Sequence, residues 1–438
     1  MTIRFSQLAA ASVAITVLAC CASASLGAAV AVSPCHLYAS PTGSDTNAGT
    51  LTSPLQTPQA LVDDLAPGQT GCLEAGTYSG YLRISHGGAA NSPLTVEAQP
   101  GATVLFLGRI WIMAGSNYVT LEGLAIDGAH SALDCSHAGC PVLPTVTING
   151  NSATVTNDKI SNEHTGICMS IGTDAGGTAT NTVVNYNVIH GCGQLPATNQ
   201  EHGIYVADSI NAVITNNYIF DNADRGVQLY PHAMDTLVRN NVIDSNGEGV
   251  LFGGDHSDVP SSGNIVSDNI ISDSAADANI DSYFAPRQPA VVNRVTDNCL
   301  WGGQVNAATG GVVARGGGFT TAGDILVNPM SAECPFLDSA AVDFNGAGRD
   351  LVAATRVTMP AASAVTTKAK TGCRRSKAKR RSGGTRESRQ ASWRVPRRST
   401  CAYRSDRSLA TLLIQHWNEG TEGTHGYDRR RSLHAGLG

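Results

Sequence analysis

Asn-Tyr-Asn-Val-Ile (185–189) returns four times before Trp301, as Thr-Asn-Asn-Tyr-Ile (215–219), Arg-Asn-Asn-Val-Ile (239–243), Ser-Asp-Asn-Ile-Ile (267–271) and Thr-Asp-Asn-Cys-Leu (296–300). The five copies align without gaps, and each begins 24 to 30 residues after the one before it. A motif that recurs at such a period is typical of a repeat protein, whose units pack mainly on their neighbours. The stretch from Asn181 to Trp301 therefore decides the fold.

Each repeat contains short segments that are rich in β-formers. An apolar pair such as Val213-Ile214 precedes the motif, and several units then carry a glycine that opens a further strand. These are Gly166-Ile-Cys-Met, Gly203-Ile-Tyr-Val, Gly226-Val-Gln-Leu and Gly249-Val-Leu-Phe. Three short strands per period exclude a helical solenoid, which needs two long helical segments per repeat. We expect an all-β chain that forms a single-stranded right-handed parallel β-helix over residues 35–350.

The third position of every motif is asparagine: Asn187, Asn217, Asn241, Asn269 and Asn298. In a β-helix these side chains would stack at one corner, each amide bonding its neighbours at the strand spacing of about 4.8 Å. The alternative is that they contact a glycan. We expect corner residues.

The N-terminus resembles an export signal. Arg4 precedes an apolar run from Leu8 to Ala19, and Ala22-Ser23-Ala24 offers a small-residue cleavage site, so residues 1–24 are expected to be a signal peptide. The run is too short to span a membrane. Val17-Leu18-Ala19-Cys20 allows the alternative of a lipid anchor at Cys20 on the cell surface. The expected location is extracellular.

Export permits disulfides. Outside the signal peptide and the C-terminal tail, eight of the 12 cysteines remain. Sequence alone does not fix their connectivity. The predicted fold suggests four pairs: Cys35–Cys72, Cys135–Cys140, Cys168–Cys192 and Cys299–Cys334.

Charge divides the chain into an acidic body and a basic tail. Residues 1–360 hold 11 Lys and Arg against 30 Asp and Glu, whereas residues 361–438 hold 18 against 5. An acidic body argues against nucleic acid as a partner, and acidic exported proteins often bind calcium. The tail at 361–438 shows no periodicity, and we expect it to be disordered; a basic arm that binds acidic glycans is the alternative.

A cap is predicted before the first coil. Gly43-Ser44-Asp45-Thr46-Asn47-Ala48-Gly49-Thr50 forms a loop, and an amphipathic helix follows from Gln59 to Leu65, with Ala60 and Leu61 on its apolar face. Ala75-Gly76-Thr77-Tyr78 belongs to the first coil. A helix here would cover the exposed end of the solenoid.

This segment resembles the opening of the pectate-lyase-like β-helix superfamily, and of family 9 polysaccharide lyases in particular, over about residues 37–350. The resemblance implies a β-helix with a substrate groove on one face. In those lyases a lysine removes the proton beside a uronic carboxylate, and aspartates hold calcium. The body of this chain has one lysine, Lys159, and no local motif places that role on it.

The residues just before the repeated glycines have side chains that are suited to catalysis. The predicted register stacks Glu163-His164-Thr165, Gln200-Glu201-His202, Ala223-Asp224-Arg225 and Asn246-Gly247-Glu248. His202, Arg225 and Glu248 would then form one exterior column, spaced by about 5 Å per coil. Strand alternation turns Tyr205, Gln228 and Tyr230 outward beside it.

These residue types suit acid–base chemistry on an acidic sugar. Arginine can pair with a uronate carboxylate, and histidine or tyrosine can take or give a proton. We predict four catalytic residues (His202, Tyr205, Arg225, Glu248), three substrate-binding residues (Glu201, Gln228, Tyr230) and three calcium ligands (Asp221, Asp224, Asp244). The alternative is an ordinary solvated surface with a weak ion pair.

The expected function is a secreted lyase that cleaves an acidic polysaccharide by β-elimination, acting as a monomer with calcium as its cofactor. Two alternatives remain open. A hydrolase or C5-epimerase could use the same side chains, and a hydrolase needs paired carboxylates, for which Asp221, Asp224 and Glu248 are candidates. A non-catalytic glycan-binding or adhesion module would carry the column on a flat face rather than in a groove.

Overall fold

The computed structural model describes residues 35–130, 143–173, 176–255, 259–284, 287–328 and 334. The predicted signal peptide, the Cys135–Cys140 pair, the final turn toward residue 350 and the basic tail lie outside the described residues. The helix α1 (Pro58–Asp64) has seven residues. No helix in the described segments is long and apolar enough to cross a bilayer.

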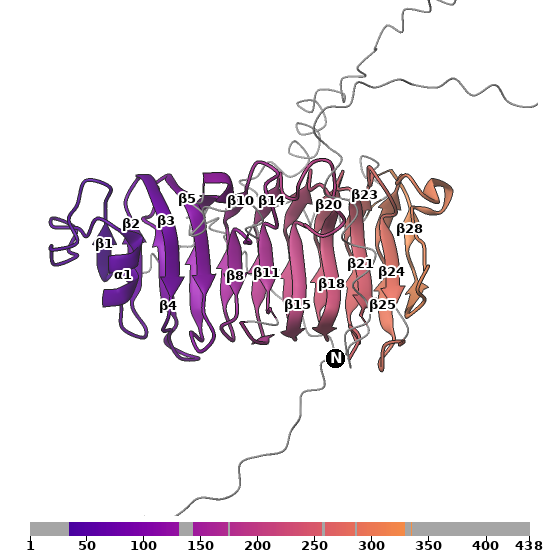
Figure 1. The fold of residues 1–438 in the computed structure, drawn as a ribbon, viewed down its shortest axis with the longest axis horizontal. Helices are drawn as coiled ribbons and strands as arrows, with labels where there is room; N and C mark the ends of the chain where they lie inside the picture. Colours follow the sequence, from indigo (N-terminus) through magenta and orange to yellow (C-terminus); the bar gives the residue numbers. More distant parts are fainter. Residues whose placement is uncertain are drawn as a thin grey trace, which may run out of the picture. The chain divides into compact units, whose positions relative to one another are not determined.

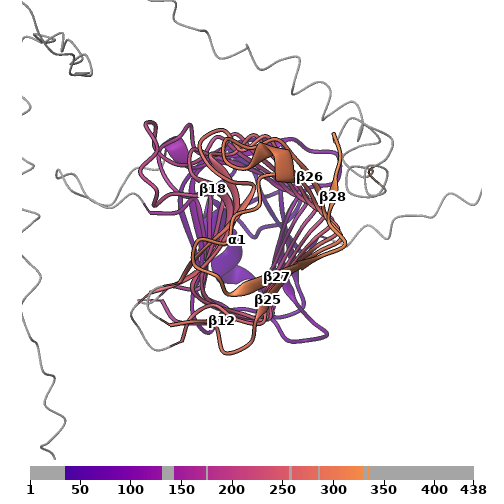
Figure 2. The same cartoon turned by 90° about the vertical axis from the view of Figure 1, so that its right-hand side faces the viewer.

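The coils stack into a parallel β-helix whose strands form three faces (Figures 1 and 2). The first face is one parallel sheet: β1 (Leu37–Ala39), β2 (Thr70–Leu73), β4 (Leu94–Ala98), β6 (Val119–Glu122), β9 (Thr154–Thr156), β13 (Val183–Asn185), β16 (Val213–Thr215), β19 (Leu237–Arg239), β22 (Ile265–Ser267), β25 (Asn293–Thr296) and β27 (Phe319–Ala322). Its neighbouring strands are neighbouring coils rather than sequence neighbours, as the predicted β-helix requires.

The second and third faces share one larger sheet. The second face holds β7 (Ala125–Asp127), β10 (Lys159–Ser161), β14 (Val188–His190), β17 (Tyr218–Phe220), β20 (Val242–Asp244), β23 (Ile270–Ser272), β26 (Cys299–Trp301) and β28 (Ile325–Leu326). The third face holds β8 (Val146–Ile148), β11 (Met169–Ile171), β15 (Ile204–Ile210), β18 (Arg225–Met234), β21 (Glu248–Gly254) and β24 (Ile280–Phe284), with β12 (Ala179–Thr180) beside the end of β15.

Two long strands join these faces at the N-terminal end. β3 (Gly76–Ile84) and β5 (Val104–Ile112) pair along their whole length. The first half of β5 then pairs with β7 and its second half with β8. The later coils break this long strand into two, one on each face. Short 3-10 turns, η1 (Gly128–His130) and η2 (Ala307–Thr309), lie in the connections.

The predicted asparagine ladder is confirmed. Each amide Nδ2 donates to the Oδ1 of the next coil, in four bonds of 2.9 to 3.0 Å from Asn187 to Asn298. The same oxygens also accept the backbone N–H of the preceding rung. All five side chains are fully buried, so the alternative of glycan contacts is wrong.

The residue before each ladder asparagine explains the rest of the motif. Tyr186, Asn216, Asn240, Asp268 and Asp297 have φ between 54° and 60°. Asparagine and aspartate tolerate this left-handed conformation better than other residues with a side chain. The Asn-Asn and Asp-Asn pairs of the sequence are therefore a corner residue followed by a ladder residue.

The cap helix is also confirmed, starting one residue earlier than predicted. The Thr57 side chain accepts the N–H of Ala60, and proline occupies the first helical turn. These are typical helix-start features. Leu61 and Val62 are fully buried against the first coils, and Figure 2 shows α1 lying across the end of the tube.

Three of the four suggested disulfides are present: Cys35–Cys72, Cys168–Cys192 and Cys299–Cys334. The first ties the N-terminal residues to β2, and the last holds Cys334 against β26. Three disulfides are consistent with an extracellular protein.

A buried carboxyl begins the ladder. Asp158 takes the rung before Asn187: its N–H donates to Asn187 Oδ1, and its own Oδ1 accepts the N–H of Leu124. Among the described residues its Oδ2 is buried without a partner, whereas each ladder asparagine has the donor Nδ2 at that position. Burial raises the pKa of Asp158 to about 8, so the folded protein holds a proton there at neutral pH.

We expect Asp158→Asn to stabilise the fold because an amide restores the missing donor. A carboxyl whose pKa rises on folding binds its proton in the folded state. Stability from this group therefore falls as pH rises from about 4 to about 8, by about 1.4 kcal/mol per unit. Urea unfolding at pH 8 should show a gain of at least about 2 kcal/mol for the variant, with a smaller gain at pH 5.

Asp297→Asn is the matched control, since Asp297 is an exposed aspartate at the same corner of a later coil, next to the ladder residue Asn298. Equal effects of the two variants, or a gain for Asp158→Asn that does not grow with pH, would contradict the assignment of a buried, protonated carboxyl.

Candidate active site on the third face

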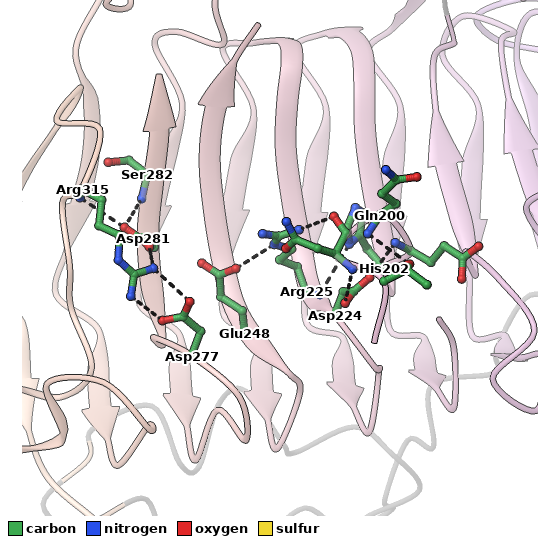
Figure 3. A network of polar contacts seen from close by, with 12 residues as sticks. Gln200, His202, Asp224, Arg225, Glu248, Asp277, Asp281, Ser282 and Arg315 are labelled. Atoms are coloured by element: carbon green, nitrogen blue, oxygen red, sulfur yellow. Dashed lines mark hydrogen bonds and ion pairs between the residues drawn. The ribbon is translucent and has the colours of Figure 1, made fainter. Parts of the chain in front are cut away.

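The third face brings two predicted columns into register. Arg225 lies opposite Glu248, and the N–H of Arg225 approaches Nδ1 of His202 at 3.5 Å. Beside them, Tyr205 pairs with Gln228, and Gln228 pairs with Leu251. Figure 3 shows His202, Arg225 and Glu248 following one another across neighbouring strands.

The predicted exterior column is buried rather than exposed to solvent, and this holds for all three of its members. His202 is only 1% exposed, and Arg225 and Glu248 are also buried. The reason is the loop before β15, which covers this edge of the face. The two oxygens of Asp224 accept the N–H groups of Asn199 and Glu201, and Glu201 accepts that of Gln194.

The Gly166 unit is out of the predicted register by two residues. Met169 pairs with Ile204, so Cys168 rather than Gly166 lies opposite Gly203. Two successive left-handed residues, Glu163 and His164, lengthen this corner. The Glu163–Thr165 segment therefore does not extend the column of His202.

The buried columns line a cavity of about 600 Å³. Its walls include six of the predicted site residues: His202, Tyr205, Arg225, Gln228, Tyr230 and Glu248. The remaining lining residues are Asn199, Gln200, Leu251, Asp277, Asp281, Ser282, Tyr283 and Arg315. Glu201 does not line the cavity but shapes its wall through the loop. A cavity at this place favours a binding site over a flat surface.

The Arg225–Glu248 pair is the most constrained charge pair in the cavity. Arg225 Nε donates to Glu248 Oε2 at 2.7 Å, and Nη1 donates to the carbonyl oxygen of Asn199 at 2.8 Å. Glu248 Oε1 is buried without a partner among the described residues. Burial raises the pKa of Glu248 to about 7, although Arg225 opposes the rise. A carboxyl poised near neutrality with one unused oxygen can exchange a proton with a ligand.

His202 is neutral and already oriented. Burial, reinforced by the charge of Arg225, lowers the pKa of His202 well below its usual range. Because Nδ1 accepts the backbone N–H of Arg225, the proton of the neutral ring belongs on Nε2. The ring also meets Tyr205 edge-on, with centroids 5.5 Å apart. His202 is therefore arranged to donate a hydrogen bond rather than to accept a proton.

A second charged cluster at the C-terminal end of the cavity was missed. Arg315 donates to both oxygens of Asp277, at 2.9 and 2.6 Å, and also to Asp281. Asp281 is 3% exposed, and burial raises its pKa. Strand alternation in Ile280-Asp281 could have placed this carboxylate outward, opposite Leu251. Arg315 lies after the last copy of the repeated motif, where the sequence shows no periodicity from which its position could be predicted.

The predicted calcium ligands do not form one site. Asp224 is bound by backbone N–H groups, and Asp244 accepts from the hydroxyls of Ser245 and Ser272. Asp221 Oδ2 lies 3.8 Å from His164 Nε2. In the described part of the chain, the one triad with ligand atoms within 4.8 Å of one another is Cys35, Cys72 and Glu97. Its cysteines are joined in a disulfide. Calcium stays a prediction without an assigned site.

Comparison with known proteins supports the fold. The family model described as a right handed beta helix region matches residues 113–321. The chain is a right-handed parallel β-helix. This match also confirms the resemblance to the pectate-lyase-like superfamily at the level of the fold.

Over 81 residues the chain is 38% identical to Pectate lyase PEL9 of Emericella nidulans, a match that covers 18% of this chain. The matched segment covers only 20% of the length of that lyase. Among solved structures, pectate lyase Pel9A is 14% identical, with a TM-score of 0.46, over 67% of this chain and 77% of that one. An alginate lyase from Paenibacillus sp. str. FPU-7 is 15% identical, with a TM-score of 0.46, over 61% and 91%. Likenesses this distant do not bear on the reaction.

We expect Arg225→Met to destabilise the protein more at pH 8.5 than at pH 5, two values on either side of the Glu248 pKa of about 7. Without its cation the buried carboxyl keeps its proton to a higher pH. Stability is then lost more steeply above pH 7 than in the wild-type protein, and the extra loss at pH 8.5 should approach about 2 kcal/mol in urea unfolding.

The double variant Arg225→Met/Glu248→Leu removes both charges and should recover most of the loss. An equal loss at both pH values would mean that the pair is not the origin of the effect.

Proposed function

We propose that the protein is a secreted carbohydrate-active enzyme that cleaves an acidic, uronate-containing polysaccharide in the cavity of the third face. The observation that carries this proposal is the buried Arg225–Glu248 pair in the wall of a cavity large enough for sugar rings. Glu248 Oε1 is buried beside this cavity and has no partner among the described residues. Tyr205, Tyr230 and Tyr283 supply aromatic walls, and Gln228 supplies an amide. Aromatic faces and a few polar groups are the usual composition of a ligand site.

The reaction class that we propose is β-elimination. Arg225 would bind the uronate carboxylate and so make the adjacent C5–H more acidic. Glu248 would then take the C5 proton, the C4=C5 double bond would form, and the C4–O4 bond would break. The leaving oxygen needs a proton, for which Tyr205 is the candidate donor. The Nε2–H of the neutral His202 would donate a hydrogen bond to the substrate and would keep its own proton.

Hydrolysis is the second candidate, because two buried carboxyls lie on neighbouring coils. Burial raises the pKa values of both Glu248 and Asp281, and both line the same cavity. Glycosidases use two carboxyl groups that flank the cleaved bond, one of them protonated as the acid. In that reaction Glu248 would give a proton rather than take one.

The first test exposes the full-length mature protein to uronic polysaccharides, with calcium and with a chelator. A lyase raises the ultraviolet absorbance of the new C4=C5 bond, whereas a hydrolase produces reducing ends without that absorbance. We expect Arg225→Ala to lower kcat/KM by about a hundredfold or more, as the loss of a charge-stabilising group does. Arg239→Ala, in which an exposed arginine on the first face loses its contact with Asp268, is the control.

The absence of both signals with every substrate would overturn the enzymatic proposal and favour a binding module. Loss of activity in the chelator alone would support a calcium cofactor, and unchanged activity would remove it from the proposal.

The pH profile distinguishes the two reactions through the Glu248 pKa of about 7. A base must be ionised, so β-elimination should lose activity as pH falls through about 7. An acid must be protonated, so hydrolysis should lose activity as pH rises through the same range. The pH dependence of the activity near pH 7 should vanish in Glu248→Gln, measured on the activity that remains in this variant. If the pH dependence persists there, a group other than Glu248 is responsible for it.

A further inference from the structure

A second group of outward side chains lies at the N-terminal end of the third face, on β3 and β5. The rings of Tyr81 and Trp111 are parallel within 7°, with centroids 6.5 Å apart. The Arg83 guanidinium lies 5.7 Å from the Tyr81 centroid and 6.0 Å from the Trp111 ring, and that of Arg109 lies 4.8 Å from Tyr81. Two aromatic faces and two cations thus meet on one patch, which we call the aromatic–arginine patch.

Arg83 lies against aromatic rings, whereas three other arginines of the body lie against carboxylates. Arg225, Arg239 and Arg315 each contact a carboxylate within 4 Å. Among the described residues no carboxylate partner is recorded for the exposed Arg83, which lies against the two rings instead. An exposed arginine that two aromatic rings hold in place can bind an external anion.

The patch is held in place by the fold. Trp111 Nε1 donates to Asn149 Oδ1 at 2.9 Å, and Asn149 in turn donates to the carbonyl of Gly177 at 2.8 Å. Arg109 Nε donates to the carbonyl of Pro144 at 2.8 Å. Binding to a preoriented patch costs less conformational entropy than binding to mobile side chains.

One column of residues connects the patch with the cavity. Arg83 pairs with Trp111, Trp111 with Thr147, Thr147 with Ser170, and Ser170 with Tyr205. Three coil steps of about 4.8 Å separate Trp111 from Tyr205, a span of about 14 Å. Thr147 Oγ1, halfway along, is buried without a partner among the described residues.

From these observations we propose that Tyr81, Arg83 and Trp111 form a remote subsite for the acidic polysaccharide whose cleaved segment occupies the cavity. The inference rests on the proposed function for its ligand class. The rings offer faces for sugar stacking, and Arg83 offers a charge for a uronate carboxylate. Each sugar unit of an extended chain advances by about one coil, so three or four units would bridge the two places.

The test is the affinity of the full-length protein for uronic oligosaccharides of increasing length, measured by calorimetry with Glu248→Gln as the background to prevent cleavage. In that background, Arg83→Gln and Tyr81→Leu should each weaken the binding of chains of about eight units by fivefold to tenfold, the effect of a lost ion pair or stacking contact. The affinity for trimers, which fill only the cavity, should stay the same. Arg294→Gln is the matched control, an exposed arginine on the first face.

Three outcomes overturn the inference: unchanged long-chain affinity in both variants, an equal loss for short and long chains, or no binding of any oligosaccharide. The first of these, with long-chain binding still dependent on Arg225, would leave the proposed function standing. Conversely, a length-dependent loss in a protein that shows neither new double bonds nor new reducing ends would support the subsite and reject the enzymatic proposal.

Discussion

The structure depends on the amide ladder from Asn187 to Asn298. A strand of three residues makes few hydrogen bonds of its own and would slip easily against its neighbour. A one-residue slip would turn the buried side chains outward. Each inner ladder asparagine instead binds the side chains of both neighbouring rungs and the backbone of the preceding coil, so every coil has one permitted register. Buried amides are costly unless they are paired, and here they are paired along the whole row.

That register also creates the candidate site. Arg225 meets Glu248, and Tyr205 meets Gln228, because the coils that carry them are aligned at a corner on another side of the tube. The glycine at the start of each of these strands reflects the same tight stacking. A Cβ on Gly249 would lie 2.2 Å from the carbonyl oxygen of Asn279, so no larger side chain fits without moving the next coil. Catalytic geometry and fold stability are thus parts of one constraint.

The sequence was sufficient for what repeats and insufficient for what does not. The period, the three strands, the ladder and the cap helix followed from spacing and alternation, and the fold predicted from them suggested the three observed disulfides. The columns of Arg225 and Tyr205 followed for the same reason. Arg315 and Asp277 were missed because they come from irregular connections near the last coils. The burial of His202 was missed because it depends on the loop around Asn199, whose path is set by Asp224 and Glu201 rather than by periodicity. The register of the Gly166 unit was predicted wrongly because the longer corner at Glu163 and His164 shifts the following strand by two residues.

The ladder has a direction, since every amide donates toward the C-terminal coil and accepts from the N-terminal one. A coil inserted between two rungs would find an acceptor on one side and a donor on the other, as the existing coils do. Gene duplication of a single repeat could therefore lengthen this protein without leaving a polar group unpaired. Evolution can then add binding surface in increments of one sugar-sized step, while the charged cavity keeps its place relative to its nearest coils.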